Sequence, residues 1–73
     1  MNTLTLPHYI AMDVDGSVYL YRVKPIRFDC GLYHHWVGDG QRFKLAPSFV
    51  SEMVPDITPE SEPIEVEITI KVK

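Results

Sequence analysis

The sequence predicts a small, mainly β protein, built as an antiparallel sheet or a half-open barrel of roughly four to five strands. Three observations indicate this class. Asp15-Gly16 separates two stretches that are rich in alternating apolar residues. A second glycine-rich turn, at 38–40, lies between two further predicted strands, 33–37 and 41–46. The segment 64–73 alternates between apolar and polar residues throughout.

The length of 73 residues allows one domain, 1–73, close to the lower size limit for a self-sufficient core. The single cysteine excludes an intramolecular disulfide. Within the domain we expect a core of two hairpins over 1–54, an acidic, proline-rich linker over 55–63 and a C-terminal strand over 64–73.

The first hairpin is predicted over residues 8–24. Its first strand alternates, and Asp15-Gly16 suits a type I′ turn, in which both central residues take a positive φ. The second strand is rich in β-branched and aromatic residues. Pro7 lacks the N–H that a strand needs for its ladder, so we expect it to stop any strand that runs through it.

The second hairpin is predicted over 33–46, and residues 25–32 before it are expected to form a loop. In its second strand Phe43 and Leu45 alternate with basic residues, and we expect these two apolar side chains to point inward.

The segment 48–54 has apolar residues at helical spacing and suits one short helix capped near Ser48, although a short irregular strand fits almost as well. The linker 55–63 is rich in prolines and acidic side chains, which favour an extended path for it. The strand at 64–73 pairs either within its own chain or with the sheet edge of a neighbour.

The net charge is −3, and all of it lies in residues 55–73, because residues 1–54 are neutral. A chain with so few basic residues is not typical of nucleic-acid binding. No stretch is long and apolar enough to cross a membrane, and we expect a cytoplasmic protein. The alternative function is a nucleic-acid-associated protein that uses a basic and aromatic sheet face, with the bases Arg22, Lys24, Arg27, Arg42 and Lys44.

The segment 10–18 is similar to the first motif of haloacid-dehalogenase-type phosphatases, in which Asp13 would be the nucleophile and Asp15 the general acid/base. Those enzymes need a larger α/β domain and further motifs, so we interpret the segment as a hairpin turn. His34 and His35 point to opposite faces of a strand and cannot chelate one metal together. We expect no catalytic residue, no cofactor and no metal site.

The predicted partner surface combines an aromatic group with the apolar face of the last strand. The aromatic face is either covered by 47–54 and the C-terminal segment, or exposed to bind a partner. Because the chain is small, we expect a homodimer that involves the strand 64–73. The candidate surface residues are Tyr19, Tyr21, Trp36, Ile64, Val66, Ile68 and Ile70.

Over residues 5–46 the chain resembles the small accessory proteins of tailed phages and prophages of enteric bacteria. The resemblance rests on the aliphatic strand that ends at Asp13-Val14-Asp15-Gly16, on the strand 18–21 and on the Lys24-Pro25 pair after it. It implies a non-enzymatic protein that works in the host cytoplasm by binding a host or phage protein.

Overall fold

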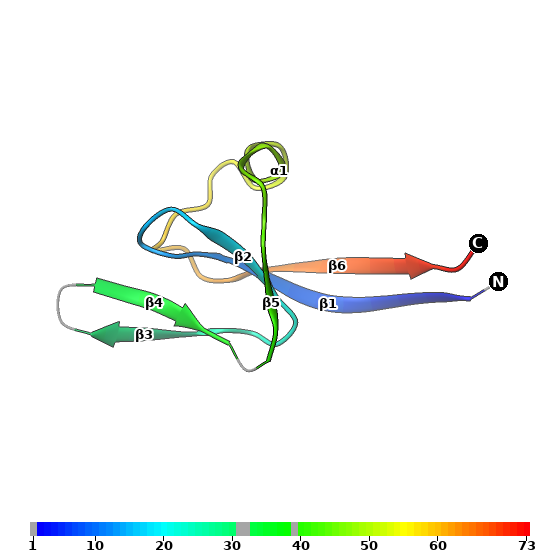
Figure 1. Cartoon of the computed structure of the whole chain (residues 1–73), viewed down its shortest axis with the longest axis horizontal. Coiled ribbons are helices and arrows are strands. Elements are labelled where there is room, and N and C mark those ends of the chain that lie inside the picture. Colours follow the sequence, from blue (N-terminus) through cyan, green and yellow to red (C-terminus); the bar gives the residue numbers. More distant parts are fainter. Residues whose placement is uncertain (1, 31–32, 39) are drawn as a thin grey trace.

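The computed structural model describes residues 2–30, 33–38 and 40–73, and at residues 29, 30 and 33–35 it describes the backbone alone. It confirms a mainly β protein with one short helix (Figure 1). The elements in chain order are β1 (Thr3–Met12), β2 (Val18–Tyr21), β3 (Ile26–Cys30), β4 (Tyr33–Val37), β5 (Arg42–Lys44), α1 (Pro47–Met53) and β6 (Ile64–Lys71).

Four strands form an antiparallel sheet in the order β5–β2–β1–β6, and β3 and β4 form a separate two-stranded sheet. Since β5 and β6 are free edges, the main sheet stays open and does not form a barrel. Helix α1 lies on one side of this sheet and the β3–β4 hairpin on the other (Figure 1). The molecule measures 50 × 26 × 16 Å, because β1 and β6 run on together as a ribbon toward the two termini.

The predicted hairpin at 8–24 is confirmed, but its turn is not type I′. The Asp13 N–H donates to the Ser17 carbonyl at 2.8 Å, and the Gly16 N–H donates to the Asp13 carbonyl at 2.9 Å. Gly16 has a φ of 91°, whereas Asp15 keeps a negative φ. This is a three-residue loop, in which a type I turn is followed by one left-handed residue.

Two backbone hydrogen bonds, one at each end of β1, show toward which neighbouring strand each residue of β1 turns its N–H and C=O groups. The Asp13 N–H bonds to Ser17 on the β2 side, and the Val72 N–H donates to the Asn2 carbonyl at 3.0 Å on the β6 side. Hydrogen-bonded pairs alternate along antiparallel strands. Odd-numbered residues of β1 therefore turn their backbone groups toward β2, and its even-numbered residues turn theirs toward β6.

The expectation that Pro7 stops the first strand is wrong, because β1 begins at Thr3 and runs through it. As an odd-numbered residue, Pro7 turns its nitrogen toward the β2 side of the strand. The pairing with β2 reaches only Tyr9, opposite Tyr21. No ladder bond is lost at Pro7, since β2 has already ended there.

The hairpin predicted over 33–46 is wrong in its pairing. β4 pairs with β3, which lies in the segment 25–32 that was expected to be a loop. β5 pairs with β2 instead, with Phe43 opposite Leu20. Phe43 is 63% exposed rather than turned inward. Helix α1 covers the sheet beside Leu45 but does not extend as far as Phe43.

Each face of the main sheet has its own small core. The face under α1 buries aliphatic side chains, and Ile57 from the linker closes it. The opposite face buries Tyr21 and Trp36 against Ala11. Since Trp36 belongs to β4, the aromatic face is covered by the β3–β4 hairpin, not by 47–54 and the C-terminal segment.

The predicted short helix is confirmed as α1, but it is not capped near Ser48. Ala46 is the N-cap and makes no side-chain cap bond, and Pro47 occupies the first turn. A proline fits there because the first N–H groups of a helix have no partner within it. Val50 packs toward the sheet, whereas Phe49 and Met53 are 43% and 61% exposed.

The linker 55–63 is folded into turns and does not follow an extended path. The Ile57 N–H donates to Val54 at 3.1 Å, and the Ser61 N–H donates to Thr58 at 3.0 Å. Ile57 is only 8% exposed, so burial of this one apolar side chain outweighs the preference of the prolines for extension.

The C-terminal strand pairs within its own chain. Strand β6 lies antiparallel to β1 along its whole length, from Ile64 opposite Ile10 to Lys71 opposite Thr3. Its outer side is the longer of the two free edges of the sheet, since β5 has three residues and β6 has eight.

Candidate interaction surface

The structure divides the predicted surface residues between the two faces of the sheet. Two of the aromatic residues lie inside the protein, since Tyr21 is 2% and Trp36 is 4% exposed. Tyr19 is half-buried beside them. The aliphatic residues lie on the other face, where exposure increases along β6 toward Ile70, which is 55% exposed. The residues in this half-buried part of β6 are Ile64, Val66 and Ile68.

The aromatic group attaches the β3–β4 hairpin to the main sheet. The Trp36 N–H donates to Asp13 Oδ1 at 3.1 Å, and Tyr21 Oη donates to the Trp36 carbonyl at 3.5 Å. Arg42 contacts both Tyr21 and Asp13: its Nη1 donates to Tyr21 Oη at 3.4 Å and lies 3.7 Å from Asp13 Oδ2. Its guanidinium also stacks 3.9 Å from the centre of the Tyr19 ring.

The electrostatics of this group follow from its burial. Desolvation raises the pKa of Tyr21, which keeps the phenol neutral and able to donate. The hydrogen bond to Tyr21 raises the pKa of Arg42, which therefore stays charged. Tyr21 and Trp36 are both buried, so neither ring is part of the partner surface that was predicted for them.

The two aspartates of the phosphatase-like motif have structural partners. Asp13 accepts the Trp36 N–H, and Asp15 Oδ1 accepts the Ser17 N–H at 2.9 Å within the turn. This bond to Ser17 is the main cause of a lowered pKa at Asp15. The bond between Asp15 and Ser17 is typical of an aspartate in a turn, in agreement with the interpretation of this segment as a turn.

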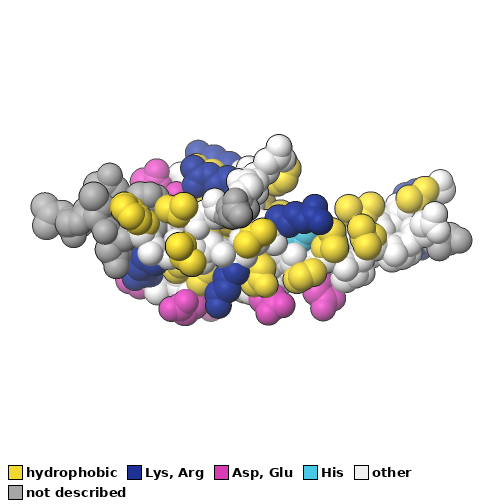
Figure 2. Space-filling view, turned by 90° about the horizontal axis from the view of Figure 1, so that it is seen from below, with side chains coloured by type: hydrophobic (Ala, Val, Ile, Leu, Met, Phe, Trp, Pro, Cys, Tyr) yellow, Lys and Arg dark blue, Asp and Glu magenta, His cyan; other side chains and the backbone are white. Residues whose placement is uncertain are grey.

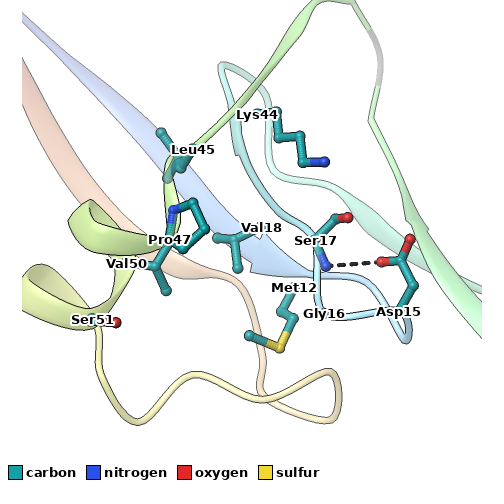
Figure 3. Close-up of a pocket in the computed structure, with 10 residues that line it drawn as sticks. All are labelled: Met12, Asp15, Gly16, Ser17, Val18, Lys44, Leu45, Pro47, Val50 and Ser51. Carbon is teal, nitrogen blue, oxygen red and sulfur yellow. Dashed lines mark hydrogen bonds between the residues drawn. The ribbon is translucent and has the colours of Figure 1, made fainter.

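A concavity of about 360 Å³ lies between this turn and the start of α1 (Figure 3). Figure 3 shows Lys44 at the top and Asp15 at the right of the view, with the apolar side chains of Val18, Met12 and Val50 toward its centre and left. Among the residues whose side chains are described, no three His, Cys, Asp or Glu side chains gather as a metal site would require. His34 and His35 lie outside the described side chains.

An apolar surface remains uncovered where the β1–β6 ribbon leaves the body of the protein. We call it the open apolar face. Its exposed members are on both strands, since Leu4 lies opposite Ile70 and is 53% exposed. Figure 2 shows hydrophobic side chains continuing along the ribbon, at the right of the view. The open apolar face comprises Leu4, Leu6, Ile68, Ile70 and Val72.

The open apolar face continues into a groove beside α1. The groove has a volume of about 160 Å³ and lies between Phe49 and Met53 of the helix and Val66 and Ile68 of β6. Contiguous apolar surface of this kind, bordered by polar residues, is typical of protein-binding sites.

The free edge of β6 borders this face. Even-numbered residues of β6 turn their backbone groups toward β1, as the bond between Val72 and Asn2 shows. The odd-numbered residues turn theirs outward, to a side where the described part of the chain places no strand. We call these residues, Glu65, Glu67, Thr69 and Lys71, the β6 edge.

Sequence reasoning found the apolar side of β6 but missed Leu4, Leu6, Phe49 and Met53. A signal for the first two was present, because Leu4 and Leu6 alternate with threonines. No strand was predicted there, because residues 1–7 were interpreted as having no periodicity and Pro7 was expected to stop any strand that runs through it. No local signal marks Phe49 and Met53 as exposed, since helical spacing is the same for a covered and an uncovered side.

No known protein family, no curated protein and no solved structure matches this chain. The helix that the structure describes is too short to cross a membrane.

Proposed function

We propose that this protein is a non-enzymatic interaction module, an accessory protein of the phage or prophage type that works in the cytoplasm of its bacterial host. Its partners are proteins, either of the host or the phage or a second copy of the chain. They add a β-strand to the β6 edge and cover the open apolar face beside it.

The observation that carries this proposal is the form of strand β6. It has eight paired residues on one side, and on the other side, about 27 Å long, no strand among the described residues pairs with it. Proteins usually shorten, cover, distort or charge such an edge, because its unpaired N–H and C=O groups are a template for another strand. The β6 edge is long, and its charges are of both signs, so a strand of complementary charge can still pair with it. In strand addition the backbone bonds supply affinity, and the alternate side chains supply specificity.

The alternative of nucleic-acid binding has less support. It requires the basic side chains to converge on one face, and Figure 2 shows Lys and Arg in separate places with acidic side chains between them. Arg42 is held by Asp13 and Tyr19, and Arg27 stacks 5.0 Å from the Trp36 ring and donates to the Pro59 carbonyl at 2.8 Å.

A proline at the centre of the β6 edge tests the proposal. Thr69 turns its N–H outward, so Thr69→Pro leaves the bonds to β1 in place, as Pro7 does in the neighbouring strand. We expect the variant to remain folded and to lose its protein partners in capture from a bacterial lysate.

Thr69→Val is the matched control. It loses the hydroxyl bond to Thr5, which is 3.0 Å long, but it keeps the outward N–H. We expect it to capture the same proteins as the wild type. If Thr69→Pro captures them equally well, the partner does not add a strand to β6 and the proposal is wrong.

A further inference from the structure

We propose that the β6 edge is self-complementary, so that two copies pair β6 against β6 in antiparallel fashion, with a two-fold axis through Thr69. This inference rests on the proposed function, and it specifies one partner and one register. It joins the two four-stranded sheets into one continuous sheet of eight strands.

The backbone of β6 allows this register. A two-fold axis at Thr69 sets this residue opposite its own copy, Glu67 opposite Lys71 of the second copy, and Glu65 opposite Lys73. All of these are odd-numbered residues, whose N–H and C=O groups turn outward. They therefore meet as hydrogen-bonded pairs, and no bond to β1 has to break.

The charges along β6 favour the same register. The polar side of the strand is acidic in its first half, neutral at Thr69 and basic in its last part. Within the chain these charges face no opposite charge across β1, since Glu65, Glu67 and Lys71 lie opposite Tyr9, Pro7 and Thr3. The proposed register gives each of them an opposite charge in the second copy, four such pairs in all.

Neighbouring registers are less favourable. An axis at Ile68 or at Ile70 also sets odd-numbered residues opposite each other, but it forms two pairs of opposite charge instead of four. An axis at Glu67 sets this glutamate against its own copy, and an axis at Lys71 does the same with the lysine. Like charges directly opposite each other on adjacent strands are destabilising. Thr69 is the centre about which the acidic and the basic halves of β6 exchange places.

The apolar side gains from the same arrangement. A two-fold axis perpendicular to the sheet keeps the open apolar faces of both copies on the same side. Ile70 then lies beside Ile68 of the second copy, and Val72 beside Val66, at the groove where Phe49 and Met53 are exposed. A second copy thus covers apolar surface that the single chain leaves open.

A charge-swap experiment in sedimentation equilibrium tests the register. The wild type is expected to form a dimer as its concentration rises. Glu67→Lys places two pairs of lysines opposite each other, and Lys71→Glu places two pairs of glutamates. Each variant alone should dimerise at least roughly tenfold more weakly than the wild type.

Mixing the two variants restores an opposite charge at both pairs, so we expect the mixture to form heterodimers about as tightly as the wild type forms homodimers. Glu60→Lys, which makes the same change of charge in the linker turn, should dimerise like the wild type. Circular dichroism of each variant confirms that it is folded.

A wild type that stays monomeric at every concentration overturns the inference, and so does a mixture that is no tighter than its components. Either result leaves the proposed function to be decided separately by lysate capture with Thr69→Pro, because an edge that rejects its own copy can still accept a strand of another protein.

Discussion

Replacing Trp36 by alanine is expected to lower the free energy of unfolding by about 3–5 kcal/mol, the usual cost of removing a buried aromatic side chain. Trp36 is 4% exposed and packs on Tyr21, where it joins the β3–β4 hairpin to the main sheet. A domain of this size has a total stability near the lower end of about 5–15 kcal/mol, so the variant loses most of it. Chemical denaturation followed by circular dichroism measures the loss.

Phe43→Ala is the matched control for Trp36→Ala. Like Trp36→Ala, it removes an aromatic side chain from a strand. Phe43 lies in β5, however, and is 63% exposed. We expect a change within about 0.5 kcal/mol. If Trp36→Ala costs no more than Phe43→Ala, the β3–β4 hairpin does not depend on Trp36 and our account of the aromatic core is wrong.

The second large effect is expected at Gly38. A Cβ atom at this position would lie 2.5 Å from Cδ2 and 3.0 Å from Cε2 of the Tyr21 ring. The ring is 2% exposed and has no room to turn away. Gly38→Ala should therefore cost about 1–3 kcal/mol through overpacking. Thermal and chemical denaturation provide the measurement.

The exposed residue Gln41, which follows Gly38 in the same connection, supplies the comparison. Gln41→Ala changes no buried contact, and its effect should stay within about 0.5 kcal/mol. A Gly38→Ala variant as stable as Gln41→Ala would show that the Tyr21 ring is not held against the backbone at Gly38.

Gly38 also shows what sequence reasoning can and cannot find. The glycine-rich segment 38–40 was predicted as the turn of a hairpin, but it connects β4, which pairs with β3, to β5, which pairs with β2. The positive φ in this segment is at Gly40, at 104°, whereas Gly38 gives space to Tyr21. That contact joins residues far apart in the chain, and local sequence carries no information on it.

The strands themselves were more predictable than their partners. Alternation located β1, β2, β4, β5 and β6, because one buried and one exposed face require a period of two. It does not encode which strand pairs with which. The partners of β4 and β5 follow from burying Trp36 on Tyr21, a contact between distant segments. The expectation for Pro7 was wrong for a related reason. Whether a proline removes a hydrogen bond of the ladder depends on where the neighbouring strand, β2, ends.

The candidate surface was predicted in part. The apolar side of β6 follows from its alternation, whereas its place next to a free edge was not predicted, since pairing within the chain and pairing with a neighbour both remained open. The aromatic residues Tyr21 and Trp36 were candidates because of their residue type, and the β3–β4 hairpin that buries them was not predicted. Exposure depends on what covers a face, and this is a property of the whole fold.

Amide hydrogen exchange measured by NMR shows whether a partner strand adds to the β6 edge. In dilute protein the outward N–H groups of Glu65, Glu67, Thr69 and Lys71 should exchange fast, while the even-numbered amides of β6 are protected by β1. When a partner binds, whether a second copy at high concentration or a captured protein, these four amides should become protected. If binding protects amides elsewhere and these four still exchange fast, the β6 edge is not the binding site.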